Sequence, residues 1–272
     1  MKIAGKRALL TGATGGLGRA IAVGLASAGA ELVLSSRKGE ELEELAAELP
    51  GDGHRFVVSD LAEPGAAEVL AAQALESSAG RVDLLVANAG LPASGWIEDF
   101  TPEQITRAVT VNLEAPMILA RQLMGPMVER GEGHLVFVSS LAGKAASPRA
   151  ALYNGTKFGL RGFALALRED LAGSGSGVGA SVVMPGFIRD AGMFADSGST
   201  TPPGVGTATP EDVAGGVIRA IESNRAEVAV APPQQRALAH FAHFFPAVSL
   251  RAQRGGGTKV AENLAKGQTD KR

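Results

Sequence analysis

The chain of 272 residues contains no cysteine, so disulfide bonds, thiolate metal sites and cysteine nucleophiles are all excluded. A protein without disulfides is expected in a reducing compartment, and we predict a cytoplasmic location. No stretch approaches about 18 consecutive apolar residues, so we predict no helix that spans a membrane. The N-terminal residues lack the apolar core and the small-residue cleavage site of a signal peptide.

Strong charge is also lacking, because the net charge is only −2 and gives no reason to expect a nucleic-acid partner. The four histidines form no metal-like cluster: His240 and His243 are three residues apart without a third ligand, and we predict no metal site. Aromatic residues are few, whereas alanine, glycine, valine and leucine abound. With 45% apolar and 20% charged residues, the composition predicts a folded globule with helices packed tightly on a sheet.

Short apolar runs alternate with longer helical patterns from residue 6 to about 231, which predicts an α/β fold. Several runs are almost continuously apolar, as in Leu84–Ala87, and such strands are typical of a parallel sheet buried on both faces. We therefore predict a doubly wound parallel sheet, a Rossmann fold, of about seven strands flanked by helices. The predicted strands are 7–11, 31–35, 55–59, 83–87, 134–139, 180–184 and 227–231.

The predicted helices are 17–28, 40–48, 64–78, 102–129, 150–172 and 210–223. Thr101-Pro102 and Thr209-Pro210 each place a capping residue before a proline at the first helical position. We expect residues 1–232 to form one domain, 233–254 a C-terminal segment and 255–272 a disordered tail.

A glycine-rich turn, Thr11-Gly-Ala-Thr-Gly-Gly-Leu-Gly18, joins the first predicted strand to the first predicted helix. Glycines in this position allow a tight turn and let the backbone approach a pyrophosphate, which then faces the positive end of the helix. The turn follows a strand and precedes a helix, which is the context that a dinucleotide site requires. We expect contacts to the cofactor from Gly12, Thr14, Gly16, Leu17 and Gly18.

The only tyrosine, Tyr153, precedes Lys157 by four residues, so the two side chains share one face of a predicted helix. A cation about 4 Å from a phenol contributes roughly 4 kcal/mol at an effective dielectric constant near 20. Lowering the pKa of the phenol by ~2 units requires only about 2.7 kcal/mol. The pair therefore predicts a proton donor and acceptor that works near neutral pH.

The glycine pattern T-G-x-x-x-G-x-G and the pair Y-x-x-x-K together resemble the short-chain dehydrogenase/reductase family, in its compact single-domain branch, over residues 5 to about 232. The resemblance implies hydride transfer between a nicotinamide and a carbonyl or secondary alcohol, with Tyr153 as general acid and base. Lys157 would lower the pKa of Tyr153 and bind the nicotinamide ribose. Ser140, thirteen residues before Tyr153, would orient the substrate oxygen, and Asn112 would serve a proton relay.

The second predicted strand ends in Leu34-Ser-Ser-Arg-Lys38, without the carboxylate that binds the ribose hydroxyl of NAD. Arg37 can instead bind the 2′-phosphate of NADP through its planar guanidinium, so we predict that NADP(H) is preferred and that NAD(H) is possible. The resemblance implies further cofactor contacts from Asp60, Leu61, Asn88, Gly90, Pro185 and Gly186.

The chain departs from the family at two places. Ala87 replaces the first of two asparagines at the end of the fourth strand. After Pro185-Gly186, a threonine often follows in the family, whereas this chain continues Phe187-Ile-Arg-Asp190. We predict no side-chain role for Asp190.

Substrate-side regions carry less information. Residues 190–208 predict a mobile loop, and the phenylalanine-rich segment 234–251 could cover a lipophilic substrate, form a subunit contact or rest on a membrane. Membrane binding is the weakest of these, because the segment holds Pro246 and few basic residues. In the family, the helices at 102–129 and 150–172 commonly pair between subunits, which implies a homodimer or homotetramer.

The sequence thus predicts an NADP(H)-dependent oxidoreductase for a carbonyl or secondary alcohol, of a substrate that is apolar because the loop lacks basic residues. Two alternatives stay open: an NAD-linked alcohol dehydrogenase, steroid-like in its substrate, and a non-catalytic regulatory protein that binds a dinucleotide.

Overall fold

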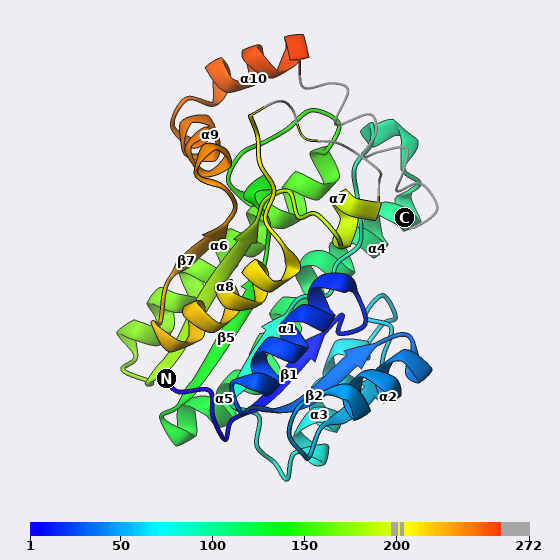
Figure 1. Ribbon diagram of the computed structural model, residues 1–272, viewed down its shortest axis with the longest axis vertical. Helices are drawn as coiled ribbons and strands as arrows, with labels where there is room; N and C mark the ends of the chain where they lie inside the picture. Colours follow the sequence, from blue (N-terminus) through cyan, green and yellow to red (C-terminus); the bar gives the residue numbers. More distant parts are fainter. Residues whose placement is uncertain (197–200, 202–203, 257–272) are drawn as a thin grey trace.

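A computed structural model describes residues 1–196, 201 and 204–256. Within these residues, seven parallel strands form one sheet in the order β3-β2-β1-β4-β5-β6-β7, which confirms the predicted Rossmann-like fold (Figure 1). The strand order reverses between β1 and β4, which lie side by side in the sheet. The strands are β1 Arg7–Thr11, β2 Glu31–Ser36, β3 Arg55–Val58, β4 Leu84–Ala87, β5 Gly133–Val138, β6 Val178–Pro185 and β7 Glu227–Val230.

Helices cover both faces of the sheet because its strands are apolar on both sides; β4, β5 and β6 are buried along their whole length. The α-helices are α1 Gly16–Ser27, α2 Gly39–Glu48, α3 Ala66–Ser77, α4 Pro102–Val109, α5 Ala115–Arg130, α6 Ala151–Gly173, α7 Gly192–Asp196, α8 Pro210–Glu222, α9 Pro233–Phe244 and α10 Pro246–Gly256. One hydrophobic core joins the sheet to α1, α2 and α8, and a second joins it to α3, α5 and α6. Short helical turns are η1 Ile97–Asp99 and η3 Leu141–Gly143.

The long helix predicted at 102–129 is interrupted. A π-helix, η2 Thr110–Glu114, separates α4 from α5 and contains Asn112. Both predicted capping residues begin helices as expected: Thr101 and Thr209 each accept a hydrogen bond from the third helical residue, with proline in the first turn.

Two substrate-side regions are more regular than predicted. The loop predicted at 190–208 contains the short helix α7, while 197–200 and 202–203 lie outside the described residues. The segment 233–254 forms α9 and α10, which stand beyond one end of the sheet (Figure 1). Of the tail predicted to be disordered, 255 and 256 belong to α10 and the remainder lies outside the described residues.

Candidate active site

The site lies where the carboxyl ends of the parallel strands meet, and where doubly wound sheets bind their ligands. One continuous cavity of about 1540 Å³ occupies this edge. Its lining includes Arg37 after β2, the loops that follow β1, β4, β5 and β6, and residues of α9 and α10. All of the predicted site residues line this cavity except Asn112, which lies behind it.

The glycine turn between β1 and α1 is closely packed, which explains its glycines. Gly12 has a φ of +65°, and a Cβ there would come within 2.9 Å of the Cα of Ala89. A Cβ on Gly18 would collide with the carbonyl oxygen of Gly12, and one on Gly16 with Ala191 of the loop after β6. Thr14 and Leu17 line the cavity beside them, and α1 begins at Gly16. The turn and the N-terminus of α1 therefore suit a dinucleotide pyrophosphate.

Asn88 fixes the end of β4 against this turn. Its side-chain amide donates to the carbonyl oxygens of Thr11 and Gly12, at 3.1 and 3.2 Å. The hydroxyl of Thr11 accepts hydrogen bonds from the backbone of Asn88 and Ala89. Asn88 thus links the end of β4 to the glycine turn. This link is present although Ala87 replaces the first of the two asparagines that the family usually has here.

The end of the cavity beside β2 and β3 is lined by charged side chains. Asp60, after β3, lies 3.8 Å from the guanidinium of Arg37 and 3.4 Å from that of Arg107 on α4. Its other carboxylate oxygen accepts a hydrogen bond from the backbone of Ala62. Leu61 is buried beside it and lines the cavity. The sequence did not reveal Arg107, because no motif links a residue on α4 to the end of β3.

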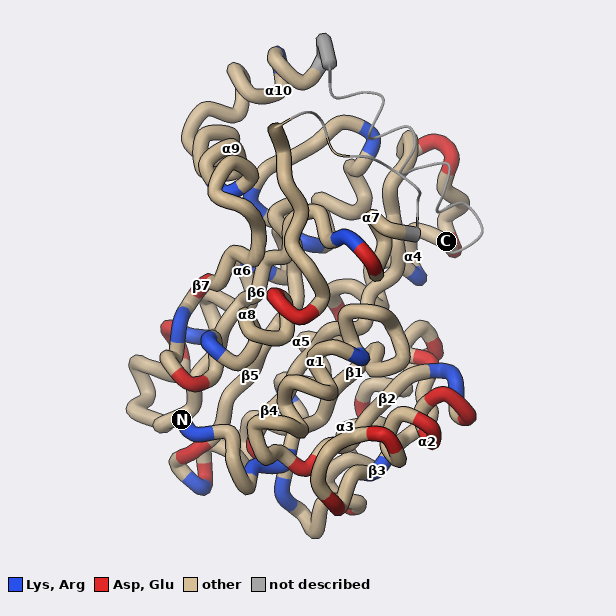
Figure 2. Tube along the Cα trace, in the orientation of Figure 1, with Lys and Arg blue, Asp and Glu red and all other residues tan. Residues whose placement is uncertain are grey.

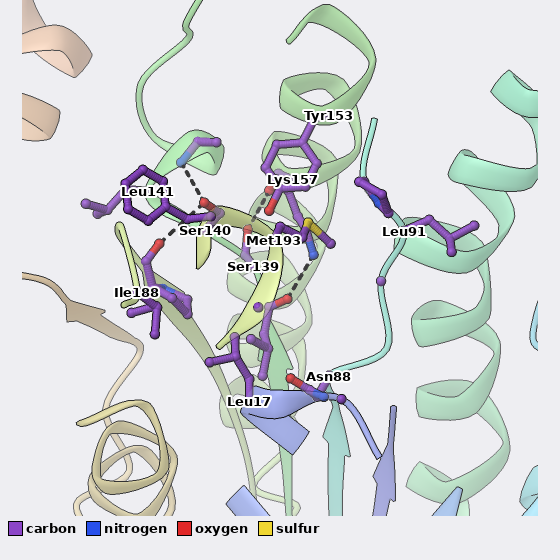
Figure 3. A pocket seen from close by; sticks show the side chains of 18 of the residues that line it. Leu17, Asn88, Leu91, Ser139, Ser140, Leu141, Tyr153, Lys157, Ile188 and Met193 are labelled. Carbon is purple, nitrogen blue, oxygen red and sulfur yellow. Dashed lines mark hydrogen bonds between the residues drawn. The ribbon is translucent and has the colours of Figure 1, made fainter. Parts of the chain in front are cut away.

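Tyr153 and Lys157 occupy successive turns of α6 and face the cavity together with Ser140 (Figure 3). The Nζ of Lys157 lies 5.8 Å from the centre of the Tyr153 ring and donates to the carbonyl oxygen of Val138 at 3.1 Å. The lysine is 4% exposed, so its charge lies almost entirely inside the protein.

The two serines after β5 have different surroundings. The buried hydroxyl of Ser139 donates to the backbone oxygen of Lys157 at 2.9 Å, and so ties β5 to α6. Ser140 is half-buried and accepts a hydrogen bond from the backbone of Ala142 at 3.1 Å. Ser140 also hydrogen-bonds to Tyr153 and faces the cavity.

Asn112 is completely buried inside the π-helix η2. Its carbonyl oxygen accepts from the backbone nitrogen of Leu91 at 2.6 Å, and its amide donates to the backbone oxygen of Leu91 at 3.0 Å. A side chain on Gly90 would begin 3.3 Å from Asn112 Oδ1 and 3.6 Å from Lys157 Nζ. Asn112 Oδ1 and Lys157 Nζ therefore both lie beside Gly90, on the side that its missing Cβ would occupy.

The pKa values differ from the sequence-based expectation of a phenol made more acidic by the lysine. Burial raises the pKa of Tyr153, and the hydrogen bond with Ser140 lowers it by less. Burial also lowers the pKa of Lys157 to about 8. Desolvation thus sets the direction of both pKa shifts, and the ammonium of Lys157 donates to the backbone oxygen of Val138.

The turn Pro185-Gly186 after β6 is held by Gln235 from α9. The side-chain oxygen of Gln235 accepts from the backbone of Phe187 at 3.0 Å, and its amide donates to the carbonyl oxygen of Gly206. A Cβ on Gly186 would collide with that same oxygen. Gln235 is buried and lines the cavity, although nothing in the sequence distinguished it from its neighbour Gln234.

The side of the cavity beyond Tyr153 is apolar. Leu141, Phe187, Phe194, Leu238 and Phe241 line it, and the rings of Phe187 and Phe194 lie 4.7 Å apart. The described lining residues contributed by α7, α9, α10 and η3 include no charged side chain. Asp190 lines the cavity on the side of the glycine turn, with φ +70° and its carboxylate 3.2 Å from the guanidinium of Arg189.

The described residues also bear on metal binding and on membrane insertion. No group of three or more histidine, aspartate or glutamate side chains there could hold a metal ion. No described helix has both the length and the apolar character that a membrane span needs.

The sheet, the glycine turn and the Ser-Tyr-Lys group define a nicotinamide-dependent oxidoreductase. The sequence profile described as short chain dehydrogenase matches residues 6–201, and the chain belongs to this family. It is therefore an oxidoreductase that acts on CH–OH or C=O groups.

Several relatives are similar over most of their length. The ketoacyl reductase HetN of Nostoc sp. is 35% identical over 84% of this chain and 79% of that protein. Dehydrogenase/reductase SDR family member 7B of Bos taurus is 32% identical over 89% of this chain and 78% of its own. A crystal structure of a short chain dehydrogenase/reductase from Burkholderia phymatum in complex with NAD has a TM-score of 0.79 and 26% identity, covering 92% of this chain and 97% of that one.

Proposed function

We propose that this protein is an NADP(H)-dependent reductase of apolar carbonyl compounds, or the corresponding alcohol dehydrogenase. The observation that carries the proposal is the placement of Ser140, Tyr153 and Lys157 around one cavity that also contains the glycine turn. A nicotinamide cofactor held by that turn supplies or accepts the hydride.

The chain's own residues handle the oxygen and its proton. The hydroxyl of Ser140 holds the substrate oxygen, and Tyr153 donates a proton to it in reduction or removes one in oxidation. The charge of Lys157 stabilises the phenolate that forms when Tyr153 has given up its proton, and its ammonium would bind the nicotinamide ribose. Asn112, whose side chain lies beside Gly90 as does Lys157, serves the relay that returns a proton to the site.

Substitution of the phenol provides the test. Tyr153→Phe removes only the hydroxyl, so we expect turnover of a test ketone to fall at least 10²-fold, in line with the contribution of general acid catalysis. Binding of the cofactor, measured by fluorescence titration, is expected to survive. Undiminished turnover would contradict the assignment, whereas cofactor binding without turnover of any ketone or alcohol by the unaltered protein would favour the non-catalytic regulatory alternative.

The preference for NADP(H) is supported by the charges around Asp60. A lone carboxylate there would repel a 2′-phosphate, but Arg37 and Arg107 both approach Asp60, and Lys38 adds a third cation. Lys38 is itself paired with Glu41 at 2.6 Å. The two arginines therefore leave a net positive charge beside Asp60, where they can bind a phosphate dianion.

Fluorescence titration with NADPH and NADH at one salt concentration tests this preference. We expect NADPH to bind at least ten times more tightly, about 1.4 kcal/mol. Arg37→Gln and Arg107→Gln should each lower the affinity for NADPH and leave the affinity for NADH almost unchanged. Arg55→Gln, on the exposed edge strand β3, is the matched control and should alter neither. Equal affinities in the unaltered protein would reject the arginine pair and favour the NAD-linked alternative.

Apolar lining supports the substrate class. A neutral carbonyl with an apolar body fits between Leu141, Phe187 and Phe241, where a carboxylate or phosphate would meet no described cation. We further propose a cytoplasmic homodimer or homotetramer, built on the helices α5 and α6.

A further inference from the structure

The helices α9 and α10 present a large apolar face to solvent. Phe241 and Phe245 stack with their ring centres 5.3 Å apart, and Phe244 is 70% exposed. Single exposed apolar residues are common on proteins, but a contiguous group of this size indicates a binding surface. We call it the C-terminal apolar face; its members are Leu238, Phe241, Phe244, Phe245 and Val248.

The charges around this face have one sign. No aspartate or glutamate occurs between Glu227 and Glu262, whereas Arg236 and Arg251 are exposed on the same two helices. Figure 2 shows α9 and α10 without an acidic residue, in contrast to the mixed charges over α2 and α3. The two helices therefore combine exposed aromatic side chains with two exposed arginines and no acidic residue.

The C-terminal apolar face is continuous with the substrate cavity. Leu238 and Phe241 belong to the face and also line the cavity beyond Tyr153. Gln235 anchors the start of α9 to the turn after β6, and Gln253 of α10 donates to the backbone oxygen of Ala146 at 3.3 Å. These contacts hold both helices over the cavity, so that the apolar face borders its mouth.

We propose that the C-terminal apolar face docks on the surface of an anionic phospholipid membrane, beside which the cavity takes up its substrate. Phenylalanines at the level of the headgroups and arginines beside lipid phosphates are the combination that an interfacial helix uses. The docking itself is independent of the reaction, whereas uptake of a membrane-dissolved carbonyl compound rests on the proposed function.

A second copy of the chain fits this face less well. A symmetric contact would place the same surface of both subunits together, and neither helix offers an acidic residue to pair with Arg236 or Arg251 of the other copy. Pro246 and the small number of basic residues argued against membrane binding in the sequence. Pro246 lies in the first turn of α10 and separates two helices without breaking either, and no acidic residue on α9 or α10 opposes the exposed arginines.

Sedimentation with vesicles tests the proposal. The full chain is mixed with vesicles of phosphatidylcholine alone and of phosphatidylcholine with phosphatidylglycerol. We expect it to bind the anionic vesicles, and the double variant Phe244→Ser/Phe245→Ser to bind at least ten times more weakly. Neither phenylalanine lines the cavity, so reduction of a water-soluble ketone should be unchanged in that variant. The matched control is Val23→Ser/Val69→Ser, which removes two exposed valines from α1 and α3.

Each outcome decides the matter. Loss of vesicle binding in the phenylalanine variant, with binding retained in the valine control, supports the proposal. Failure of the unaltered protein to bind anionic vesicles overturns it, as does equal loss in both variants. A change in molar mass of the phenylalanine variant without vesicle binding by the unaltered protein would identify the face as a subunit contact instead. Because vesicle binding needs no turnover, failure here leaves the proposed reaction untouched.

Discussion

Lys157 carries its charge in a buried position, and this placement destabilises the fold at neutral pH. Burial lowers its pKa from 10.5 to about 8, so the protonated lysine costs the folded state about 3 kcal/mol at pH 7. The hydrogen bond to Val138 offsets only part of that cost. A site that needs a cation beside a phenol thus retains one at the expense of stability.

Replacement of this lysine should therefore stabilise the protein. We expect Lys157→Met to raise the free energy of unfolding at pH 7 by about 2 kcal/mol, once the loss of one hydrogen bond worth about 1 kcal/mol is included. Between pH 8 and 10.5 the unfolded chain keeps a proton on Lys157 that the native state has released, so the stability of the unaltered protein rises and the advantage of the variant shrinks.

Urea unfolding of both proteins at pH 7 and pH 10 provides the measurement. Lys2→Met changes an exposed lysine and should show no such dependence. If the Lys157→Met variant has a lower free energy of unfolding than the unaltered protein at pH 7, the buried ammonium does not destabilise the fold.

At the scale of elements, α9 is joined to the catalytic domain through Gln235. This buried side chain bridges the backbones of Phe187 and Gly206, and so connects the helix to the turn beside the cavity. Buried polar groups that lose their partner carry the full cost of desolvation, about 1–3 kcal/mol. One amide thereby couples the position of the substrate wall to β6.

Gln235→Leu should remove the hydrogen bonds that connect α9 to the turn after β6. We expect the KM for an apolar ketone to rise about tenfold as Leu238 and Phe241 lose their position, and the free energy of unfolding to fall by about 1–3 kcal/mol. NADPH binding should weaken by less than the KM rises, because Gln235 supports only the Pro185-Gly186 part of the predicted cofactor site. Gln234→Leu replaces the exposed neighbour and serves as the control. Equal effects from the two variants in steady-state kinetics would refute the bridging role.

Some helices and strands could be predicted from local sequence patterns alone. The capping boxes at Thr101 and Thr209 and the strand at Leu84–Ala87 follow from residues within a few positions of each other, and the structure confirms them. The π-helix at Asn112 could not be predicted, because the pattern of apolar residues continues through it. Within it, Asn112 makes a long-range pair of hydrogen bonds to the backbone of Leu91.

At the scale of the whole molecule, a buried histidine makes the sheet sensitive to acid. His134 on β5 is 2% exposed and contacts the hydroxyl of Ser181 on β6 at 2.8 Å. Burial lowers its pKa from 6.5 to about 3, so the native state holds this ring neutral. As pH falls from 6.5, the unfolded chain gains a proton there that the native state does not, and stability is lost down to about pH 3.

Removal of this ring should protect the fold in acid. Between pH 6.5 and 4 we expect His134 to account for a loss of about 3 kcal/mol in the free energy of unfolding, which His134→Gln would abolish. Denaturant unfolding of both proteins across this range is the measurement, compared as differences because other groups titrate as well. His240→Gln, at an exposed position on α9, should follow the unaltered protein. Parallel curves for all three would exclude His134 as the source.

The parallel sheet, the glycine turn and the spacing of Tyr153 and Lys157 could be predicted from the sequence alone. Each of them depends on the geometry of one strand, one turn or one helix. The contact of Arg107 with Asp60 and the hydrogen bond between Gln235 and Phe187 are visible only in the tertiary structure, because these residues are distant from their partners along the chain. The tertiary structure also decided the direction of the Tyr153 and Lys157 pKa shifts, because desolvation depends on everything packed around a group and not on its neighbours in the chain.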